Sequence, residues 1–214
     1  MPAADGTGKS APSHYFSRDP QAESQPARCM VVIWGERLPF TTDSGVFSKD
    51  RLDPGTELLL ETVPRILRPE DRRVLDLGCG WGAVGIAVAR RWPHLFVVGV
   101  DVNRRAVALA QQNAAQLGLS NYRALEGDGP AAARDVLPGP LDVILTNPPL
   151  RAGKEVVLRL LAESRALLRP GSRLAAVIRT RQGAKSYLKA LERQFTLATT
   201  LERGGGYRVL LAEV

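Results

Sequence analysis

The fold is decided by one stretch, Val74-Leu75-Asp76-Leu77-Gly78-Cys79-Gly80-Trp81-Gly82-Ala83-Val84-Gly85. An apolar run typical of a buried strand leads into closely spaced glycines, and an apolar helix pattern follows. Glycine lets the backbone turn sharply and lets a ligand lie against the main chain. The helix start adds unpaired N–H groups and a partial positive charge. This order predicts a cradle for a nucleotide-type cofactor.

Two kinds of cofactor compete for this cradle. Gly80-x-Gly82-x-x-Gly85 also matches the dinucleotide fingerprint, so the glycines alone are weak evidence. Asp76, two residues before the first glycine, would repel a pyrophosphate but suits a cationic group. S-adenosylmethionine, which carries a sulfonium and a free ammonium, therefore fits better. The plain alternative is a structural strand-to-helix turn without a ligand.

The rest of the chain alternates strand and helix patterns. Strands are expected at 73–76, 95–100, 122–126, 141–146 and 173–178, and helices at 83–91, 104–117, 154–168 and 184–193. A hairpin of 195–201 and 207–212, with its turn at 202–206, ends the chain, and another hairpin is expected at 29–34 and 37–41. These elements predict an α/β, Rossmann-like sheet of seven strands. It would be mostly parallel, with one antiparallel strand in the C-terminal hairpin.

Composition sets the expected organisation. The chain has 214 residues, of which 44% are hydrophobic, and this length suits one α/β domain with a short extension. We expect a disordered tail at 1–13, a small N-terminal β-hairpin extension at 14–44 and a cofactor domain at 45–214. No apolar run reaches a membrane span, and Cys29 and Cys79 have no metal-type spacing, so a cytoplasmic protein without a metal is expected.

The charge balance bears on the partner. Lys and Arg outnumber Asp and Glu by 29 to 22, giving a net charge of +7. A basic balance favours an anionic partner such as RNA. A soluble, Arg-rich surface explains the charge equally well. The sequence does not indicate an oligomeric state.

Four polar residues fall where expected parallel strands end: Asp76, Asp101, Asp128 and Asn147. The ligand crevice of such a sheet lies outside the carboxyl ends of its strands. Asp101, at the tip of the second strand, is placed to accept hydrogen bonds from a ribose, and it could also cap the helix that begins near Asn103. Asp128, between two glycines, could equally be a turn residue.

Asn147-Pro148-Pro149-Leu150 suits chemistry on a planar amine. The lone pair of such an amine is delocalised, so acceptors on its N–H groups are needed to aim it at a methyl group. The side-chain oxygen of Asn147 and the carbonyl of Pro148 supply two acceptors, and Pro148 and Pro149 fix the backbone at low entropic cost. Positioning and electrostatics would then carry the step, with no metal and no covalent intermediate. The alternative is a turn that ends a strand.

These motifs resemble those of class I S-adenosylmethionine-dependent methyltransferases. From Gly45 to Val214 the chain resembles the ribosomal small-subunit RNA guanine-N2 methyltransferases, and with its hairpin it resembles their short, single-domain branch. The motifs that carry the resemblance are Gly-Val-Phe-Ser at 45–48, Leu-Asp-Leu-Gly-Cys-Gly-Trp-Gly at 75–82, Val-Asp-Val-Asn at 100–103 and Thr-Asn-Pro-Pro-Leu-Arg-Ala-Gly-Lys at 146–154. Larger members carry an additional N-terminal domain that helps to recognise RNA.

The resemblance implies roles for individual residues. Asn147, Pro148 and Pro149 would be catalytic. The cofactor would be S-adenosylmethionine, bound by Asp76, Gly78, Gly80, Gly82, Asp101, Val102, Asp128 and Gly129, with Asp128 on the adenine amino group. The substrate would be held by Phe47, Leu150, Arg151, Lys154 and Arg181. Phe47 would belong to a loop that closes over the pocket, or else it is a hydrophobic staple at a helix entry.

The expected reaction is methyl transfer to guanine N2 of small-subunit rRNA, as free RNA or in the assembled subunit. Leu150 stands where enzymes that act on adenine commonly carry an aromatic residue, which weakens an adenine N6 target. A protein glutamine amide or a small molecule remains as an alternative acceptor. A non-catalytic RNA-binding or ribosome-assembly factor is the alternative outside enzymes, and a dinucleotide oxidoreductase is the least favoured hypothesis.

Overall fold

The computed structural model describes residue 18, residues 22–48 and residues 51–214. The tail expected at 1–13 and the first part of the expected extension, 14–17, lie outside these residues. The domain boundary predicted at residue 45 remains a prediction.

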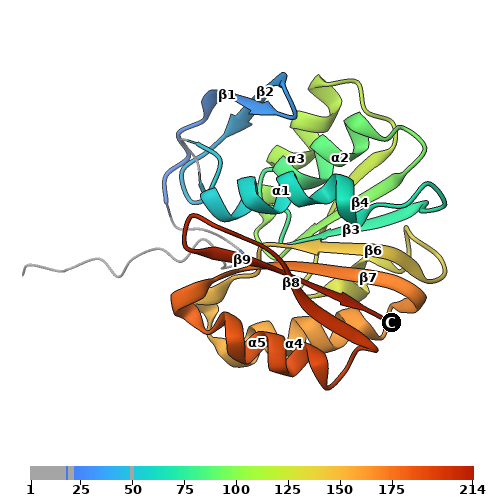
Figure 1. Cartoon of the computed structure of the whole chain (residues 1–214). Coiled ribbons are helices and arrows are strands. Elements are labelled where there is room, and N and C mark those ends of the chain that lie inside the picture. The colour runs from blue at the N-terminus through green and yellow to red at the C-terminus, as the bar shows by residue number, and fades with distance from the viewer. Residues whose placement is uncertain (1–17, 19–21, 49–50) are drawn as a thin grey trace, which may run out of the picture.

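A seven-stranded sheet forms the centre of the fold (Figure 1). The strands stand in the order β5-β4-β3-β6-β7-β9-β8, and among the described strands of this sheet β9 alone runs against the others. This confirms the predicted α/β sheet with one reversed strand in the C-terminal hairpin. The bounds are β3 (Arg73–Leu77), β4 (Phe96–Asp101), β5 (Tyr122–Glu126), β6 (Leu141–Thr146), β7 (Leu168–Arg179), β8 (Leu197–Gly204) and β9 (Tyr207–Glu213).

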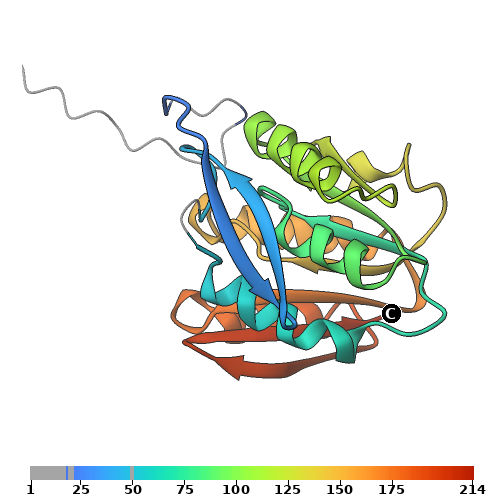
Figure 2. The same cartoon turned by 90° about the horizontal axis from the view of Figure 1, so that it is seen from above.

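Helices cover both faces of the sheet (Figures 1 and 2). One face carries α1 (Pro54–Ile66), α2 (Ala83–Arg91) and α3 (Arg104–Gln116); the other carries α4 (Lys154–Arg165) and α5 (Ala184–Glu192). Three short 3-10 turns that the sequence did not predict complete the connections: η1 (Pro130–Ala133), η2 (Leu150–Ala152) and η3 (Thr180–Gln182). Because β3 and β6 lie between two helical layers, their residues are almost all buried.

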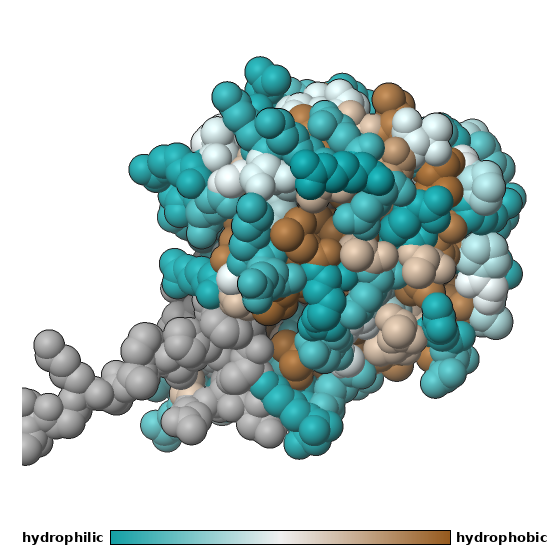
Figure 3. All heavy atoms as spheres, turned by 90° about the horizontal axis from the view of Figure 1, so that it is seen from below, coloured by the Kyte–Doolittle hydropathy of each residue, from teal (hydrophilic) through white to brown (hydrophobic). Residues whose placement is uncertain are grey.

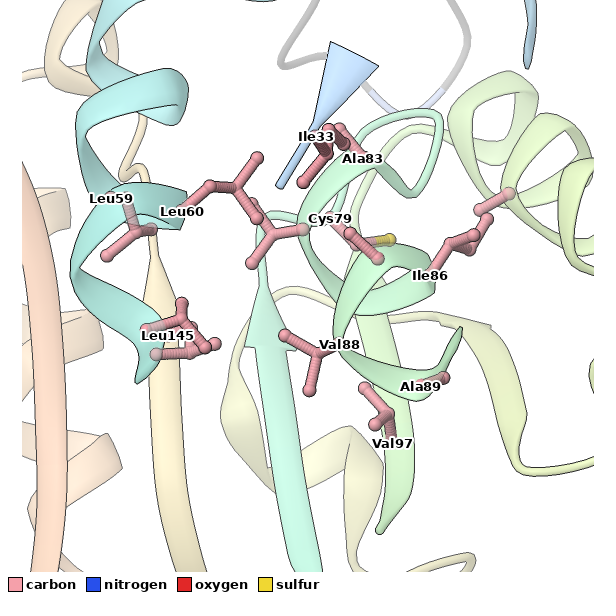
Figure 4. Close-up of a cluster of buried hydrophobic side chains, with 14 of the residues drawn as sticks. Ile33, Leu59, Leu60, Cys79, Ala83, Ile86, Val88, Ala89, Val97 and Leu145 are labelled. Carbon is pink, nitrogen blue, oxygen red and sulfur yellow. The ribbon is translucent and has the colours of Figure 1, made fainter. Parts of the chain in front are cut away.

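Each helical layer packs an apolar cluster against the sheet. On the side of α1 and α2, the cluster contains Leu59 and Leu60 of α1, Ile86 and Val88 of α2, and side chains from the strands beneath (Figure 4). On the side of α4 and α5, Figure 3 shows mostly hydrophilic side chains with smaller hydrophobic areas between them. None of the helices in the described part of the chain is long and apolar enough to cross a bilayer.

The N-terminal hairpin pairs β1 (Ala27–Ile33) with β2 (Glu36–Thr42) and lies beside α2 and α3 (Figure 2). Asn113 of α3 joins it to the domain. Its side-chain oxygen accepts from the Thr41 N–H at 2.7 Å, and its amide nitrogen donates to the Thr41 and Trp81 carbonyls at 2.9 Å each. Phe40 packs edge-on against Trp81, with ring centroids 4.8 Å apart. The hairpin is therefore docked by both polar and apolar contacts.

Several element boundaries differ from the sequence prediction. β7 begins at Leu168, and the turn expected at 169–171 is an excursion within it: Leu141 pairs with Leu168, and Val143 pairs with Arg173. The C-terminal hairpin turn is only Gly205-Gly206, because both residues adopt positive φ, 54° and 83°, as a tight two-residue turn requires. β8 begins at Leu197 rather than at 195, because the Phe195 N–H donates to the Leu191 carbonyl at the end of α5, at 2.9 Å.

Replacing Asn113 by Ala should loosen the hairpin. The substitution leaves three backbone groups without partners, so we expect the free energy of unfolding to fall by about 2–4 kcal/mol in denaturant titrations. Gln111→Ala is the matched control on the same helix, because Gln111 is exposed and donates one hydrogen bond, to the Ala124 carbonyl. It should cost less than about 1 kcal/mol. Equal losses in the two variants would contradict the docking role.

Candidate functional site

The glycine turn between β3 and α2 is bound to the end of β4. The N–H groups of Gly78 and Cys79 both donate to the Val100 carbonyl, at 2.7 and 3.1 Å, and the Gly80 N–H donates to Asp101 Oδ2 at 2.9 Å. Gly78 and Gly80 have φ of 75° and 54°, which L side chains rarely adopt. A Cβ added at Gly80 would meet no atom within 4 Å. The turn therefore leaves open space against its main chain.

Asp101 joins this turn to the start of α3. Its second oxygen accepts from the Asn103 N–H at 2.9 Å. Asn103, and not Asp101, is the N-cap of α3, because the Asn103 side chain accepts from the Arg105 and Ala106 N–H groups. Burial raises the pKa of Asp101, while the N–H groups of Asn103 and Gly80 oppose the shift. Asp101 thus presents a partly desolvated carboxylate at the tip of β4.

Asp76 lies beneath the first turn of α2. Its Oδ2 accepts from the Gly85 N–H at 2.8 Å, at a helix whose N-cap residue, Gly82, offers no side chain. Burial raises the pKa of Asp76 to about 7; the Gly85 N–H opposes the shift, and the charge of Asp101 adds to it. Asp76 does not line the cavity described below. The position of Asp76 therefore indicates that it supports the first turn of α2 and acts on the site through its charge. It does not indicate the direct cofactor contact that the sequence predicted.

Asn147 follows β6 and contacts the first turn of α1. Its amide nitrogen donates to Asp53 Oδ2 at 3.1 Å and to Thr56 Oγ1 at 2.9 Å. Asp53 is the N-cap of α1 and accepts from the Gly55 and Thr56 N–H groups. The contact between this cap and Asn147 was not predicted.

Pro148 and Pro149 continue from Asn147 into η2. The Pro148 carbonyl, predicted to accept from a substrate amine, accepts from the Leu150 N–H at 2.8 Å, and the Pro149 carbonyl accepts from Ala152 at 2.8 Å. A carbonyl oxygen has two lone pairs, so Pro148 retains acceptor capacity.

The segment 43–48 forms another wall. Asn103 donates to the Gly45 carbonyl at 3.0 Å, and the Trp81 indole donates to the Phe47 carbonyl at 3.1 Å. The Phe47 side chain is 37% exposed, whereas Val46 is buried. This exposure argues against Phe47 as a hydrophobic staple and favours a place at the mouth of the site.

These elements enclose a cavity of about 290 Å³ at the carboxyl edge of the sheet. Among the residues predicted from sequence, those in its wall are Gly78, Gly80, Asp101, Val102, Asp128, Gly129, Asn147, Pro148, Pro149, Phe47, Leu150 and Arg151. Those not in its wall are Asp76, Gly82, Lys154 and Arg181. Gly82 is a packing position instead, since a Cβ there would lie 2.6 Å from Ile86. Lys154 and Arg181 are exposed.

Several wall residues were not predicted as site residues, notably Ser48, Asp53, Thr56, Trp81, Asn103, Gln182 and Tyr207. Arg179 also lines the cavity, and its guanidinium carbon lies 5.8 Å from the centroid of the Tyr207 ring. Asp128 is 77% exposed and pairs with Arg159 at 3.0 Å, so a ligand contact would compete with this ion pair.

The side chains at the site bear on which mechanisms it favours. Burial raises the pKa of the Cys79 thiol well above its usual value, and the charges of Asp101 and Asp76 act in the same direction. A protonated thiol is a poor nucleophile, so the site does not favour covalent catalysis. Within the described residues, His, Cys, Asp and Glu side chains do not gather in a group of three that could hold a metal ion.

The site also fits one cofactor class. Gly78 and Gly80 leave space beside the main chain, Asp101 offers acceptor oxygens for hydroxyl groups, and the buried carboxylates of Asp76 and Asp101 favour a cationic ligand. The family model "Methyltransferase small domain" matches residues 37–211.

The chain belongs to the methyltransferase small domain family.

Relatives agree with this assignment. The uncharacterized protein YbxB of Bacillus subtilis is 34% identical over 94% of this chain and 98% of its own length. The ribosomal RNA small subunit methyltransferase C of Hahella chejuensis is 36% identical over 66% of this chain, which spans 40% of that relative. The solved T. thermophilus 16S rRNA N2 methyltransferase RsmC, in complex with AdoMet and guanosine, has a TM-score of 0.76 and 31% identity. That match covers 89% of this chain and 51% of that one.

The resemblance seen in the motifs is thus confirmed, and the protein is an S-adenosylmethionine-dependent methyltransferase. Gly78, Gly80, Asp101, Val102, Asp128 and Gly129 line the cavity, and their contact with the cofactor remains a prediction. When bound, S-adenosylmethionine supplies an electrophilic methyl group, and both electrons of the broken carbon–sulfur bond stay on sulfur.

Gly80→Ala should block cofactor binding specifically. The new methyl group would project into the cavity, and the positive φ adds strain of about 1–2 kcal/mol. Gly118→Ala is the matched control, because Gly118 has φ of 66°, has no atom near its Cβ position and lies outside the cavity. Both variants should lose similar thermal stability, but only Gly80→Ala should lose affinity for S-adenosylmethionine in calorimetry. Equal affinities would contradict the cradle.

Cofactor affinity should depend on pH through Asp76. Because its folded pKa of about 7 lies above the ordinary 3.8, folding takes up a proton between these values, and this group's contribution to stability declines as the pH rises towards 7. A cationic ligand favours the ionised carboxylate, so its affinity should fall as the pH drops below 7. The limit for one coupled proton is about tenfold per pH unit.

Calorimetry between pH 5.5 and 8 tests this dependence, and Asp76→Asn provides the comparison. The variant keeps an acceptor for the Gly85 N–H, and titration of the ligand itself is common to both proteins. Its affinity should vary less with pH than that of the wild type. Parallel pH profiles for the two proteins would show that Asp76 does not sense the ligand's charge.

Proposed function

We propose that this enzyme transfers the methyl group to an exocyclic amine, specifically guanine N2 of small-subunit rRNA. One observation carries the proposal. Asn147 lines the cavity, both its amide-nitrogen contacts are to protein groups, and within the described residues its Oδ1 accepts no hydrogen bond. An amide oxygen in this position is available to accept from a planar amine.

Asn147 Oδ1 and the second lone pair of the Pro148 carbonyl would accept the two N–H groups of the amine. These contacts disfavour delocalisation of the nitrogen lone pair and direct it at the methyl carbon. The nitrogen forms the new bond with this pair and then loses one proton to solvent. The residues act by orientation, and this reaction does not need a nucleophile or a general base from the protein.

Three observations support guanine N2 of rRNA as the group that receives the methyl. The solved relative with guanosine acts on N2 of 16S rRNA, as its name states. Leu150 occupies the position after the two prolines and lines the cavity, where an aromatic side chain would favour stacking on adenine. The exposed side chains of Arg151 and Arg179 at the cavity, and of Arg181 in the adjoining η3, supply positive charge for backbone phosphates.

Transfer of labelled methyl groups tests the proposal. We expect label in the small-subunit rRNA of ribosomes from a strain that lacks this gene, and N2-methylguanosine after nucleoside mass spectrometry. Asn147→Ala should bind S-adenosylmethionine normally but lose at least about a hundredfold in rate. Gln111→Ala, outside the cavity, should react like the wild type.

The same assay separates the alternatives. Label in protein or in a small molecule, with none in RNA, would reject rRNA as the substrate. Bound cofactor without transfer to any acceptor, together with normal function of Asn147→Ala in cells, would favour a non-catalytic assembly factor.

A further inference from the structure

We propose that Asp53 and Thr56, from the first turn of α1, are positioning residues that hold the Asn147 amide in the one orientation that directs its oxygen towards the acceptor amine. This inference rests on the proposed function for its catalytic consequence. The geometric part, a fixed amide, depends on this chain alone.

The contacts define the orientation of the amide. An amide nitrogen carries two hydrogens, and Asn147 directs it at two acceptors: Asp53 Oδ2 at 3.1 Å and Thr56 Oγ1 at 2.9 Å. A carboxylate only accepts hydrogen bonds. Rotating the amide by 180° would place Oδ1 against the Asp53 oxygen, lose that hydrogen bond and add repulsion, whereas the Thr56 hydroxyl could still donate to Oδ1. Asp53 therefore sets the preferred orientation. The flipped state is therefore disfavoured before any substrate arrives.

Asp53 is itself fixed. Its Oδ2 also accepts from the Gly55 and Thr56 N–H groups at 2.8 and 3.1 Å, as an N-cap does. The Tyr207 ring packs over Gly55, where a Cβ would lie 2.8 Å from ring atoms, and the Tyr207 hydroxyl stands 3.5 Å from Asp53 Oδ1. The carboxylate thus has little freedom to leave Asn147.

The arrangement also affects the acceptor strength of the amide oxygen. A hydrogen bond from an amide N–H to a charged acceptor is stronger than one to a neutral acceptor, and linked hydrogen bonds polarise one another. The charge of Asp53 therefore increases the electron density on Asn147 Oδ1. Asp53 acts on the reaction through Asn147 and needs no contact with the substrate.

Variants at Asp53 can separate this role from helix capping. Asp53→Ser keeps a good N-cap, but its side chain is too short to reach Asn147. Asp53→Asn also caps, but it removes the charge and can offer its own N–H groups to Asn147. For both we expect unchanged S-adenosylmethionine affinity, a KM for RNA within about twofold of wild type, and a kcat lower by about tenfold to a hundredfold.

Two substitutions at Thr56 give a second test of the positioning role. Thr56→Val has the same shape without the acceptor, so its kcat should fall, whereas Thr56→Ser keeps the hydroxyl and should retain more activity than Thr56→Val. Thr62→Val is the control on the same helix. Its hydroxyl bonds to the Leu59 carbonyl within α1, away from the cavity, and this variant should react like the wild type.

A double-mutant cycle tests whether Asp53 acts through Asn147. The variant carrying both Asp53→Ser and Asn147→Ala should be no slower than Asn147→Ala alone, because the residue that Asp53 orients is gone. Losses that multiply in the double variant would show two independent roles and would overturn the proposal.

An NMR measurement on the Asn147 side-chain amide tests its fixed orientation without any substrate. The side-chain NH₂ protons of Asn147, assigned from Asn147→Ala, should exchange slowly with water in the wild type and faster in Asp53→Ser and Thr56→Val. If wild-type protein methylates no RNA but shows the protected amide, the proposed function fails and the positioning stands. Fast exchange in the wild type, or full kcat in Asp53→Ser while Asn147→Ala is inactive, would overturn the positioning itself.

Discussion

The architecture of the site depends on the binding of one turn to one strand end. Three consecutive N–H groups, from Gly78, Cys79 and Gly80, all donate to the last residues of β4, two to the Val100 carbonyl and one to the Asp101 carboxylate. This fixes the path of the chain between β3 and α2. It also fixes the orientation of the Asp101 carboxylate. Gly80 lines the cavity, and no atom lies within 4 Å of the position that a Cβ would take there. The cofactor wall is therefore a product of backbone hydrogen bonding more than of side-chain chemistry.

A second set of contacts brings the opposite wall to this turn. The N-cap of α1 contacts the end of β6, and the segment 43–48 contacts Trp81 and Asn103. Both contacts join parts of the chain that precede β3 to the strands of the sheet. The described residues before β3 thus complete the site, although none of them forms a strand of the central sheet.

Sequence reasoning succeeded where the signal is local. The order of apolar run, glycines and apolar helix specifies strand, turn and helix, and a polar residue after an apolar strand marks the carboxyl edge, as at Asp101 and Asn147. It failed where the contact is distant or depends on the face of a strand. Asp53 and Asn147 are 94 residues apart. Asp76 belongs to a strand that is buried on both sides, so no alternation shows that its side chain lies under α2.

The single reversed strand has a consequence for the rim of the site. A parallel strand reaches the carboxyl edge with its final residue, and the chain then continues as a loop. β9 instead begins at that edge, so Tyr207, its first residue, is paired on both sides, with Arg179 of β7 and Gly204 of β8. An aromatic residue at the mouth of the site is thereby paired with a neighbouring strand on each side. Its position is set by the length of the Gly205-Gly206 turn, so inserting one residue in that turn would change the geometry of the active-site rim.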